Sequence, residues 1–338
     1  MRVAVLMSGG VDSSVALSLL LEEGHECVGV SLLFHPDSTC CRPEDIEDAA
    51  EVARRLGAEH TVVDLQAAFR EHVVEAFVKG YAEGRTPNPC PICNARIKFG
   101  LGLEWALSQG FDRVSSGHYA RLRAERGEVF LERARDETRS QEYFLALVRP
   151  ESLVRAMFPL GELLKEEVRE LAKRKGLPVS EKPESQDACF VRGDIRAFLA
   201  ERLGPRPGRF LDSSGRILGH HDGHYAYTIG QRRGHGVAMG QRAYIIRIEP
   251  PDVILGTREE ACSRTLRLSS VNRFTELIEG EVFSVKIRYS HEPAEAVLVS
   301  DLGDELTLEF REPQFSVVPG QLGVLYRGMR VVAGGIIV

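Results

Sequence analysis

The first half of the chain alternates between two hydrophobic patterns. Residues 3–7 form a continuous apolar run, which predicts a strand buried on both faces. A helix is predicted at 11–23, and a second at 45–56 places its apolar residues on one face. The pattern also predicts strands at 27–34, 61–65 and 113–116, and helices at 69–81 and 95–108. Such alternation predicts an α/β fold with a doubly wound parallel sheet, whose ligands bind at the carboxyl ends of the strands.

After about residue 204 the pattern changes to short strands separated by turns. The stretch GPRPGRF (204–210) has the composition of a linker. Strands are expected at 243–248, 266–269, 282–289, 296–299, 305–310 and 321–326. The chain has 338 residues, too many for one ordinary core. We therefore expect a catalytic domain over 1–200, a small β-rich central domain over 205–265 and a C-terminal β-barrel over 266–338.

Composition narrows the class of protein. Hydrophobic residues make up 43% and charged residues 27%, as in ordinary soluble proteins. No run approaches the ~20 apolar residues of a membrane span, and the first residues do not resemble a signal peptide, so we expect a cytoplasmic protein without a membrane partner. Seven cysteines, unevenly placed, argue against a disulfide framework and favour metal or catalytic use.

A glycine-rich turn follows the first predicted strand. It reads SGGVDSS (8–14) and leads into a helix, so its backbone N–H groups would form an anion site. The lysine of a Walker A loop is missing, and the turn is not GxGxxG. The simplest alternative is a tight turn with serine caps. The position at the end of the first buried strand favours a nucleotide site.

Two cysteines stand three apart in NPCPICN (88–94). This spacing is compatible with a zinc knuckle, a redox pair or a sulfur-handling site. A zinc site lacks an obvious second C-x-x-C pair. A redox pair is disfavoured because the segment joins two predicted helices and does not follow an early strand.

The region 202–247 is locally basic on a chain of net charge −6. It holds eight arginines against two acidic residues, and it includes GQRRG (230–234) and several tyrosines. A charge run is usually a solvated face. Arginines interleaved with aromatic residues also fit phosphate contacts and base stacking on RNA.

Two levels of resemblance follow from these motifs. SGGVDSS resembles the PP-loop signature of ATP pyrophosphatases, which cleave ATP between the α- and β-phosphates, usually with Mg²⁺. Over almost the whole chain the sequence resembles the tRNA-specific 2-thiouridylase family (MnmA). The segments that carry this resemblance are RTPNPCPICNARIKFG, SSGHYARL, TRSQEYFLALV, FPLGELLKEEVRELA, SQDACFVRG, YTIGQRRGHGV and PGQLGVLYRG.

The resemblance implies ATP-dependent 2-thiolation of the wobble uridine (U34) of tRNA, by adenylation of its C2 oxygen and then sulfur transfer. It implies a persulfide on Cys189 and a nucleophile or disulfide partner at Cys93. Asp12 would be catalytic by helping to hold the metal–pyrophosphate unit. The implied ATP-binding residues are Leu6, Met7, Ser8, Gly9, Gly10, Val11, Asp12, Ser13, Ser14, Leu32 and Gly117.

Cys90 departs from the family pattern, which commonly has aspartate there. With Cys93 and Cys189 it would provide three thiolates, and three cysteines can hold a [4Fe–4S] cluster with one open iron. Our hypothesis is that these three residues ligate such a cluster, which supplies the sulfur. A disulfide or persulfide mechanism that uses Cys93 and Cys189 alone is close behind it. Cys40 and Cys41 would serve as a fourth ligand or a sulfur relay, or simply lie in a loop.

The resemblance also implies contacts with the anticodon stem-loop of tRNA. The family's K-D-Q triplet is Arg-Ser-Gln here, so Ser140 departs from the pattern. Among the histidines, we expect His118 to bond locally and not to act as a base, and 220, 221 and 224 to be loop histidines near RNA. The expected tRNA-contacting residues are Asn88, Pro89, Arg139, Ser140, Gln141, Arg232, Arg233, Arg288 and Tyr289.

The remaining partner is a sulfur donor, which would be a desulfurase, a relay protein or sulfide. Two rival functions stay open. One is another AMP-forming PP-loop ligase, similar to lysidine synthase, which needs no cysteine pair. The other is a non-catalytic RNA-binding module with a structural metal.

Overall fold

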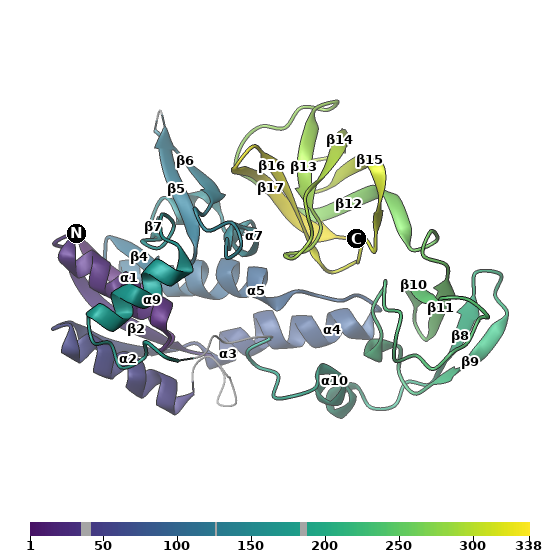
Figure 1. Cartoon of the computed structure of the whole chain (residues 1–338), viewed down its shortest axis with the longest axis horizontal. Coiled ribbons are helices and arrows are strands. Elements are labelled where there is room, and N and C mark those ends of the chain that lie inside the picture. Colours follow the sequence, from purple (N-terminus) through teal and green to yellow (C-terminus); the bar gives the residue numbers. More distant parts are fainter. Residues whose placement is uncertain (35–41, 126, 183–187) are drawn as a thin grey trace. The chain divides into compact units, whose positions relative to one another are not determined.

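The computed structural model describes residues 1–34, 42–125, 127–182 and 188–338. The chain divides into two compact units, and Figure 1 labels their elements. The first unit comprises Met1–Val74, Pro89–Arg192 and Met329–Val331, and the second comprises Glu75–Asn88, Gly193–Gly328 and Val332–Val338. Within the described residues, every helix is too short or too polar to span a bilayer.

The first unit is built on a five-stranded parallel sheet of order β3-β2-β1-β4-β7. At its centre, Val3 of β1 pairs with Cys27 on one side and Arg113 on the other. Four of the five β1 residues are buried, which explains the continuous apolar run. The strands are β1 (Arg2–Leu6), β2 (Glu26–Leu33), β3 (Glu59–Asp64), β4 (Arg113–Ser116) and β7 (Ala156–Met157).

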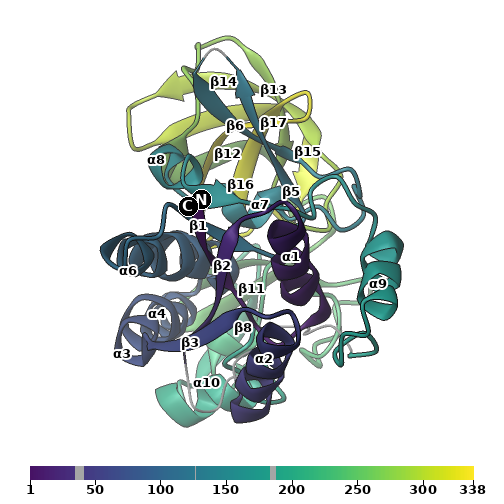
Figure 2. The same ribbon diagram turned by 90° about the vertical axis from the view of Figure 1, so that its left-hand side faces the viewer.

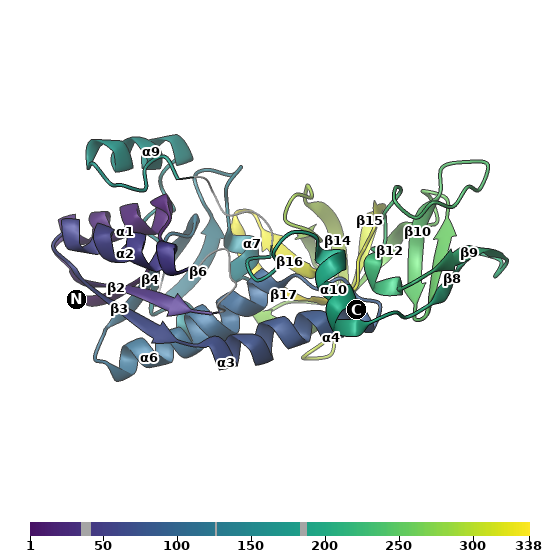
Figure 3. The ribbon, with the colours of Figure 1, turned by 90° about the horizontal axis from the view of Figure 1, so that it is seen from below.

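Helices cover both faces of this sheet, so the predicted doubly wound fold is confirmed. Helices α1 (Val11–Glu22) and α2 (Pro43–Arg55) lie on one face, and α6 (Gly102–Ser108) lies on the other (Figure 2). Helix α9 (Lys165–Arg174) packs outside α1 (Figure 3). The side chains of α1 and β1 meet in a core whose central residues are fully buried.

Two predicted helices prove to be composite. The segment 69–81 consists of α3 (Gln66–Phe69), the π-helix η1 (Arg70–Glu75) and α4 (Ala76–Ala82). The helix predicted to begin at Ala95 in fact begins earlier, with α5 (Pro89–Ile92) and the π-helix η2 (Cys93–Leu101) preceding α6. The prolines of this segment suggested a loop between two helices. The first turn of a helix nevertheless tolerates proline, because its N–H groups have no helical partner.

The pattern also missed smaller elements of the first unit. A hairpin follows β4. Its two strands are antiparallel, and Ala120 on the first strand pairs with Arg133 on the second. Its strands carry many charged residues, so they lack an apolar run. The missed elements are β5 (Ala120–Glu125), β6 (Glu128–Arg133), α7 (Glu142–Leu145) and α8 (Pro150–Leu153).

The second unit contains a small sheet and a barrel. The sheet has the order β10-β11-β8-β9, preceded by α10 (Ile195–Leu203). Strand β8 begins at Gly208, inside the predicted linker, where a Cβ atom would lie 2.0 Å from the Pro251 carbonyl oxygen. Glycine is therefore required by close strand packing there, and the linker prediction was too long. The elements are β8 (Gly208–Asp212), β9 (Ile217–His221), the 3-10 helix η3 (His224–Ala226), β10 (Tyr244–Glu249) and β11 (Asp252–Gly256).

Six antiparallel strands close the C-terminal barrel. The order β12-β15-β14-β13-β16-β17 is completed by pairing of β17 with β12, for example Ile337 with Leu268. Alternate side chains such as Leu308 and Phe310 fill the interior. The expected barrel is thus confirmed. Its strands are β12 (Cys262–Arg273), β13 (Val282–Lys286), β14 (Ala294–Asp301), β15 (Leu306–Phe315), β16 (Leu322–Arg327) and β17 (Arg330–Ile337).

Candidate active site

The strand order of the first unit defines a topological switch point. The chain runs outward from β1 through β2 to β3, and then returns to place β4 on the other side of β1. Ligands of open α/β sheets bind outside the carboxyl ends of the strands at such a point. The glycine-rich turn follows β1 and Gly117 follows β4, so both predicted nucleotide-binding segments flank it.

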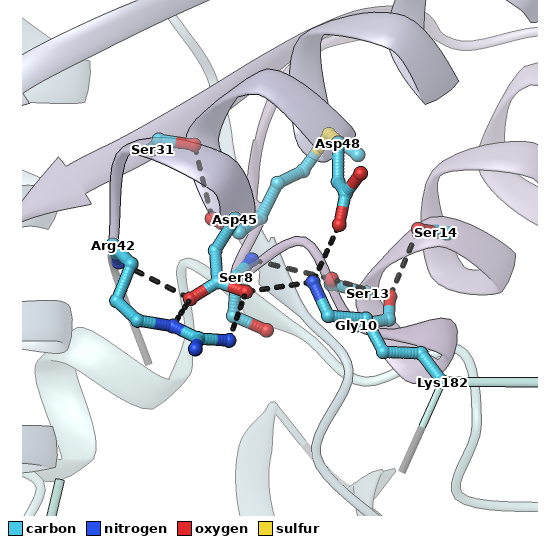
Figure 4. Close-up of polar contacts among 10 residues, drawn as sticks. Ser8, Gly10, Ser13, Ser14, Ser31, Arg42, Asp45, Asp48 and Lys182 are labelled. Atoms are coloured by element: carbon cyan, nitrogen blue, oxygen red, sulfur yellow. Dashed lines mark hydrogen bonds and ion pairs between the residues drawn. The ribbon is translucent and has the colours of Figure 1, made fainter. Parts of the chain in front are cut away.

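Serine hydroxyls shape the glycine-rich turn, which we call the phosphate loop (Ser8–Ser14). The Ser14 Oγ donates to the Gly10 carbonyl oxygen at 2.9 Å, and the Ser13 Oγ donates to the same oxygen at 3.2 Å (Figure 4). The Ser13 Oγ also accepts from the Ser8 N–H at 3.3 Å. These bonds hold the loop at the start of α1, where unpaired N–H groups attract anions.

Glycine permits close packing around the phosphate loop. A Cβ atom on Gly117 would lie 2.7 Å from the Ser13 nitrogen, so the chain after β4 touches the start of α1. The predicted ATP-binding residues Leu6, Met7 and Leu32 are buried. The Ser31 hydroxyl bonds the Met7 carbonyl oxygen at 3.2 Å (Figure 4).

Asp12 has two partners that the sequence did not reveal. Lys165 Nζ lies 2.7 and 2.8 Å from its two carboxylate oxygens, and the Tyr119 hydroxyl donates to Oδ1 at 2.8 Å. Lys165 stands in the motif FPLGELLKEEVRELA, yet it is 153 residues from Asp12, so no local spacing predicts the pair. The Asp12 side chain remains 30% exposed.

The Asp12 carboxylate fits a role beside Mg²⁺. Mg²⁺ prefers hard oxygen ligands and is usually held by one or two carboxylates together with substrate phosphates. Asp12 lies in the first turn of α1, next to the loop amides. Bound there, Mg²⁺ would neutralise part of the charge of the phosphates.

His118 bonds locally, as expected. Its Nδ1 lies 2.7 Å from the Ser116 Oγ, and its ring packs near Phe99 and Phe158. Burial, with a smaller contribution from Lys98, lowers the pKa of His118 well below its ordinary value. The imidazole is therefore neutral near pH 7.

The cysteine pair lies on helical backbone, in a segment we call the cysteine helix (Pro89–Leu101). Cys90 is exposed, whereas Cys93 is 8% exposed and begins the π-helix η2. The next residue, Asn94, fixes this turn by donating from Nδ2 to the Phe144 carbonyl oxygen at 3.0 Å. Irregular π-helical turns often occur at functional sites.

The other cysteines differ in burial. Cys189 is partly exposed and follows the undescribed segment 183–187. Burial raises the pKa of Cys27 to about 11, which makes it unreactive, as expected of a small core residue. Cys40 and Cys41 lie outside the described residues.

The described residues do not form the geometry of a metal cluster. Within 1–34, 42–125, 127–182 and 188–338, no three His, Cys, Asp or Glu side chains are grouped as metal ligands. The arrangement of Cys90, Cys93 and Cys189 in this structure therefore does not fit a three-thiolate iron site.

Two of the three residues Arg139, Ser140 and Gln141, which are predicted to contact tRNA, form hydrogen bonds within the protein. Ser140 is buried, and its Oγ accepts from the Ala134 N–H at 2.7 Å and donates to the Glu142 carboxylate. Gln141 Oε1 accepts from the Tyr119 N–H at 2.9 Å. Arg139 is exposed, which leaves its side chain accessible.

The other predicted tRNA residues lie in the second unit, except Pro89, which belongs to the first. Arg232 and Arg233 are exposed in a loop that His235 Nε2 and Gln231 Nε2 order through bonds to their carbonyl oxygens. The Arg288 guanidinium donates to the carbonyl oxygens of residues 315 and 316 at 2.9 and 3.0 Å. Asn88, Pro89 and Tyr289 are half-buried.

Two histidines expected near RNA lie inside the second unit. His221 is 6% exposed on β9, with Phe210 and Tyr227 against its ring. His224 is 2% exposed, and its Nε2 lies 3.0 Å from the Ala82 carbonyl oxygen. The expectation of loop histidines was wrong, because His220 and His221 lie on strand β9 and His224 lies in the 3-10 helix η3.

A phosphate loop at the switch point of a parallel sheet places the first unit among the α/β proteins that bind nucleotides. Family models match all three parts of the chain. They are a "tRNA methyl transferase HUP domain" at 1–193, a "tRNA methyl transferase PRC-barrel domain" at 196–255 and an "Aminomethyltransferase beta-barrel domain" at 263–337.

Curated relatives agree over the full length. A tRNA-specific 2-thiouridylase MnmA of Acidithiobacillus ferrooxidans is 42% identical over 99% of this chain and 97% of its own. The proteins of the same name from Aquifex aeolicus and Treponema denticola are 40% and 42% identical, over 99% and 98% of their lengths and all of this chain. The chain belongs to the tRNA-specific 2-thiouridylase MnmA family.

Proposed function

We propose that this protein is an ATP-dependent tRNA-uridine 2-sulfurtransferase that thiolates U34. The observation that carries the proposal is one compact unit that holds both a phosphate loop at its switch point and the cysteine helix. The full-length relatives named as 2-thiouridylases support this reaction.

The first step activates the uridine. Its C2 oxygen attacks the α-phosphorus of ATP, the bond to the β-phosphate bridging oxygen breaks, and pyrophosphate leaves with the electron pair. The loop amides and the start of α1 hold the phosphates. Asp12, steadied by Lys165 and Tyr119, would hold Mg²⁺, which neutralises charge on the leaving group. The product is an adenylated uridine whose AMP is a good leaving group.

The second step transfers sulfur. The terminal sulfur of a persulfide on Cys189 attacks C2, and AMP leaves with the electrons of the C2–O bond. The Cys93 thiolate then attacks the Cys189 Sγ, which leaves sulfur on C2 and joins the two cysteines in a disulfide. A thiol reductant then opens the disulfide, and a desulfurase or a relay protein passes persulfide-level sulfur to Cys189. Sulfide as the donor would instead attack the Cys189 Sγ of the disulfide directly, which gives the Cys189 persulfide and releases the Cys93 thiolate.

In this proposal, residues of the second unit bind the tRNA. Arg232 and Arg233 are exposed cations on an ordered loop, suited to phosphate contacts. The target base must leave its stack, which costs least in a single-stranded anticodon loop. The domain limits at 200, 205 and 265 and a cytoplasmic location belong to the same proposal.

The sulfur route through two cysteines is favoured over the cluster. Cys90 is exposed, and the described residues do not form a three-ligand metal group. We therefore derive no step through iron. The cluster hypothesis is tested directly by measuring iron in protein purified and reconstituted without oxygen.

The experiment is mass spectrometry of nucleosides from unmodified tRNA incubated without oxygen with the protein, ATP, Mg²⁺, a thiol reductant, and a desulfurase with its cysteine substrate as the source of persulfide sulfur. We expect ATP-dependent 2-thiouridine with the wild type and none with Cys93→Ser or Cys189→Ser. Cys262→Ser is the matched control, because this partly exposed thiol lies on the barrel strand β12. AMP formed with tRNA but without 2-thiouridine, at the same rate in the wild type and in both cysteine variants, would favour the lysidine-synthase-like rival. Failure to form AMP with tRNA present would favour the binding module.

A further inference from the structure

Four charged side chains meet beside the phosphate loop, and the reaction described above uses none of them. Lys182 Nζ lies 2.6 Å from Asp45 Oδ1 and 2.6 Å from Asp48 Oδ2. Arg42 Nε donates to Asp45 Oδ2 at 3.1 Å, and the Arg42 backbone N–H donates to the same oxygen at 3.1 Å. Figure 4 shows the Asp45 carboxylate between the two cations.

This cluster is in direct contact with the loop. A Cβ atom added to Gly9 would lie 2.2 Å from the Asp45 carbonyl oxygen, so the start of α2 packs on the Gly9 backbone. The Asp45 side chain is only 4% exposed. Burial alone would raise the pKa of Asp45, but the bonds from Arg42 and Lys182 hold it below its ordinary value, so the carboxylate is ionised.

The phosphate loop itself lacks positive side chains. Ser8–Ser14 contains no lysine or arginine, and it contains the acidic Asp12, which pairs with Lys165. A bound triphosphate carries several negative charges, so neighbouring elements must supply cations beyond a metal ion. Arg42 and Lys182 are the cations that Asp45 brings to the loop.

The two cations differ in how far their charge is already neutralised and how much of the side chain is exposed. Lys182 lies between two carboxylates and is 24% exposed, so its charge is already neutralised. Arg42 pairs with one carboxylate, which Lys182 shares, and its side chain is 48% exposed. A guanidinium has five donors, and Asp45 orients part of them while the rest can face solvent. Arg42 is therefore the pre-oriented cation of the cluster.

We propose that Arg42 binds the β- and γ-phosphates of ATP and stabilises the departing pyrophosphate, with Asp45 as its positioning residue. This inference rests on the proposed function, because it assumes cleavage between the α- and β-phosphates. The α-phosphorus must stay open to the attacking uridine oxygen, whereas negative charge develops on the pyrophosphate as the bond breaks. A fixed cation is most effective where charge develops.

The test measures binding of Mg²⁺·ATP, Mg²⁺·pyrophosphate and AMP separately by calorimetry. Arg42→Ala should weaken ATP and pyrophosphate binding about 10-fold or more, the loss expected for charge-assisted hydrogen bonds, and leave AMP binding unchanged. Arg42→Lys should restore part of that affinity, because it keeps the charge and loses the fork. Thermal unfolding confirms that each variant folds.

Arg55→Ala is the matched control. Arg55 lies at the other end of α2, is 49% exposed and pairs with Glu51, so it matches Arg42 in exposure and in having a carboxylate partner on its own helix, but it lies away from Gly9. Its variant should bind all three ligands as the wild type does.

Two results for Arg42→Ala would overturn the inference. Pyrophosphate binding equal to the wild type would show that Arg42 does not touch those phosphates. An equal loss for ATP, pyrophosphate and AMP would show that it only supports the loop. A wild type that binds no ATP would instead overturn the proposed function, and the inference with it.

Discussion

The phosphate loop and the cysteine helix belong to the same unit but depend on different properties of their residues. The loop is defined by backbone packing: Gly9 touches Asp45, and Gly117 touches Ser13, at distances where no Cβ fits. In the cysteine helix, by contrast, the proposed chemistry depends on a side-chain atom, the sulfur of Cys93. The loop should therefore fail through added volume, and the helix through lost reactivity.

The largest expected effect tests the helix side of this comparison. Serine in place of Cys93 or Cys189 keeps the size of the side chain but removes the sulfur nucleophile. Thiolation should fall at least about 1,000-fold, as when other catalytic nucleophiles are removed, while ATP binding stays unchanged. Nucleoside mass spectrometry and calorimetry measure the two readouts. If a serine variant lost ATP binding together with thiolation, the cysteine would have a structural role as well as a chemical one.

The next effect tests the loop side. Gly117→Ala adds one methyl group 2.7 Å from the Ser13 nitrogen, so the start of α1 must move. A displacement of this kind should lower kcat/KM for ATP about 100-fold. Alkylation of Cys93 by iodoacetamide should keep its wild-type rate. Gly219→Ala is the control, since its Cβ would meet only ordinary contacts at 3.7 Å.

A smaller effect sharpens the role of the buried partner of Asp12. Lys165→Met removes the ammonium group that bonds both Asp12 oxygens. Because the Asp12 side chain is partly exposed, water compensates in part, and kcat/KM for ATP should fall about 10-fold. Lys173→Met on the same helix is the control, because Lys173 pairs with the exposed Glu181 and not with a residue of the phosphate loop among those the structure describes. Equal activity of both variants would exclude a role for Lys165.

The smallest effect concerns His118, whose ring packs beside Phe99 of the cysteine helix and which directly follows Gly117. Its folded-state pKa lies below the unfolded value near 6.5, so the unfolded chain binds the proton first. Stability is therefore complete above pH 6.5 and falls as the pH drops below it. His118→Asn, which can still bond Ser116, should lose less stability between pH 7.5 and 5.5. Thermal unfolding at the two pH values measures the difference; equal losses in both proteins would show that His118 does not cause it.

Much of the first unit was predictable because parallel strands are buried on both faces. Residues 3–7 are a continuous apolar run for that reason, and the observed strand Arg2–Leu6 matches it within one residue. The phosphate loop was predictable because glycines between a strand and a helix are unusual and local in sequence. The hairpin at 120–133 was missed because charged residues interrupt its strands.

Long-range side-chain pairs were beyond the reach of the pattern. Asp12 and Lys165 are 153 residues apart, and Asp45 and Lys182 are 137 apart. Such pairs are created by the packing of α1 against α9, or by the return of the chain to α2, and no spacing rule encodes them. The helical start at Pro89 was missed for another reason, since proline signals both turns and first helical turns.

The order of strands in the barrel has a consequence for synthesis on the ribosome. Strand β17 (Arg330–Ile337) is the last of the six to be made, and it pairs with β12, the first. Until it emerges, β12 and β16 each present an unpaired edge to other nascent chains. The barrel must therefore finish folding after translation of its last strand, and premature termination there would release an open, aggregation-prone sheet.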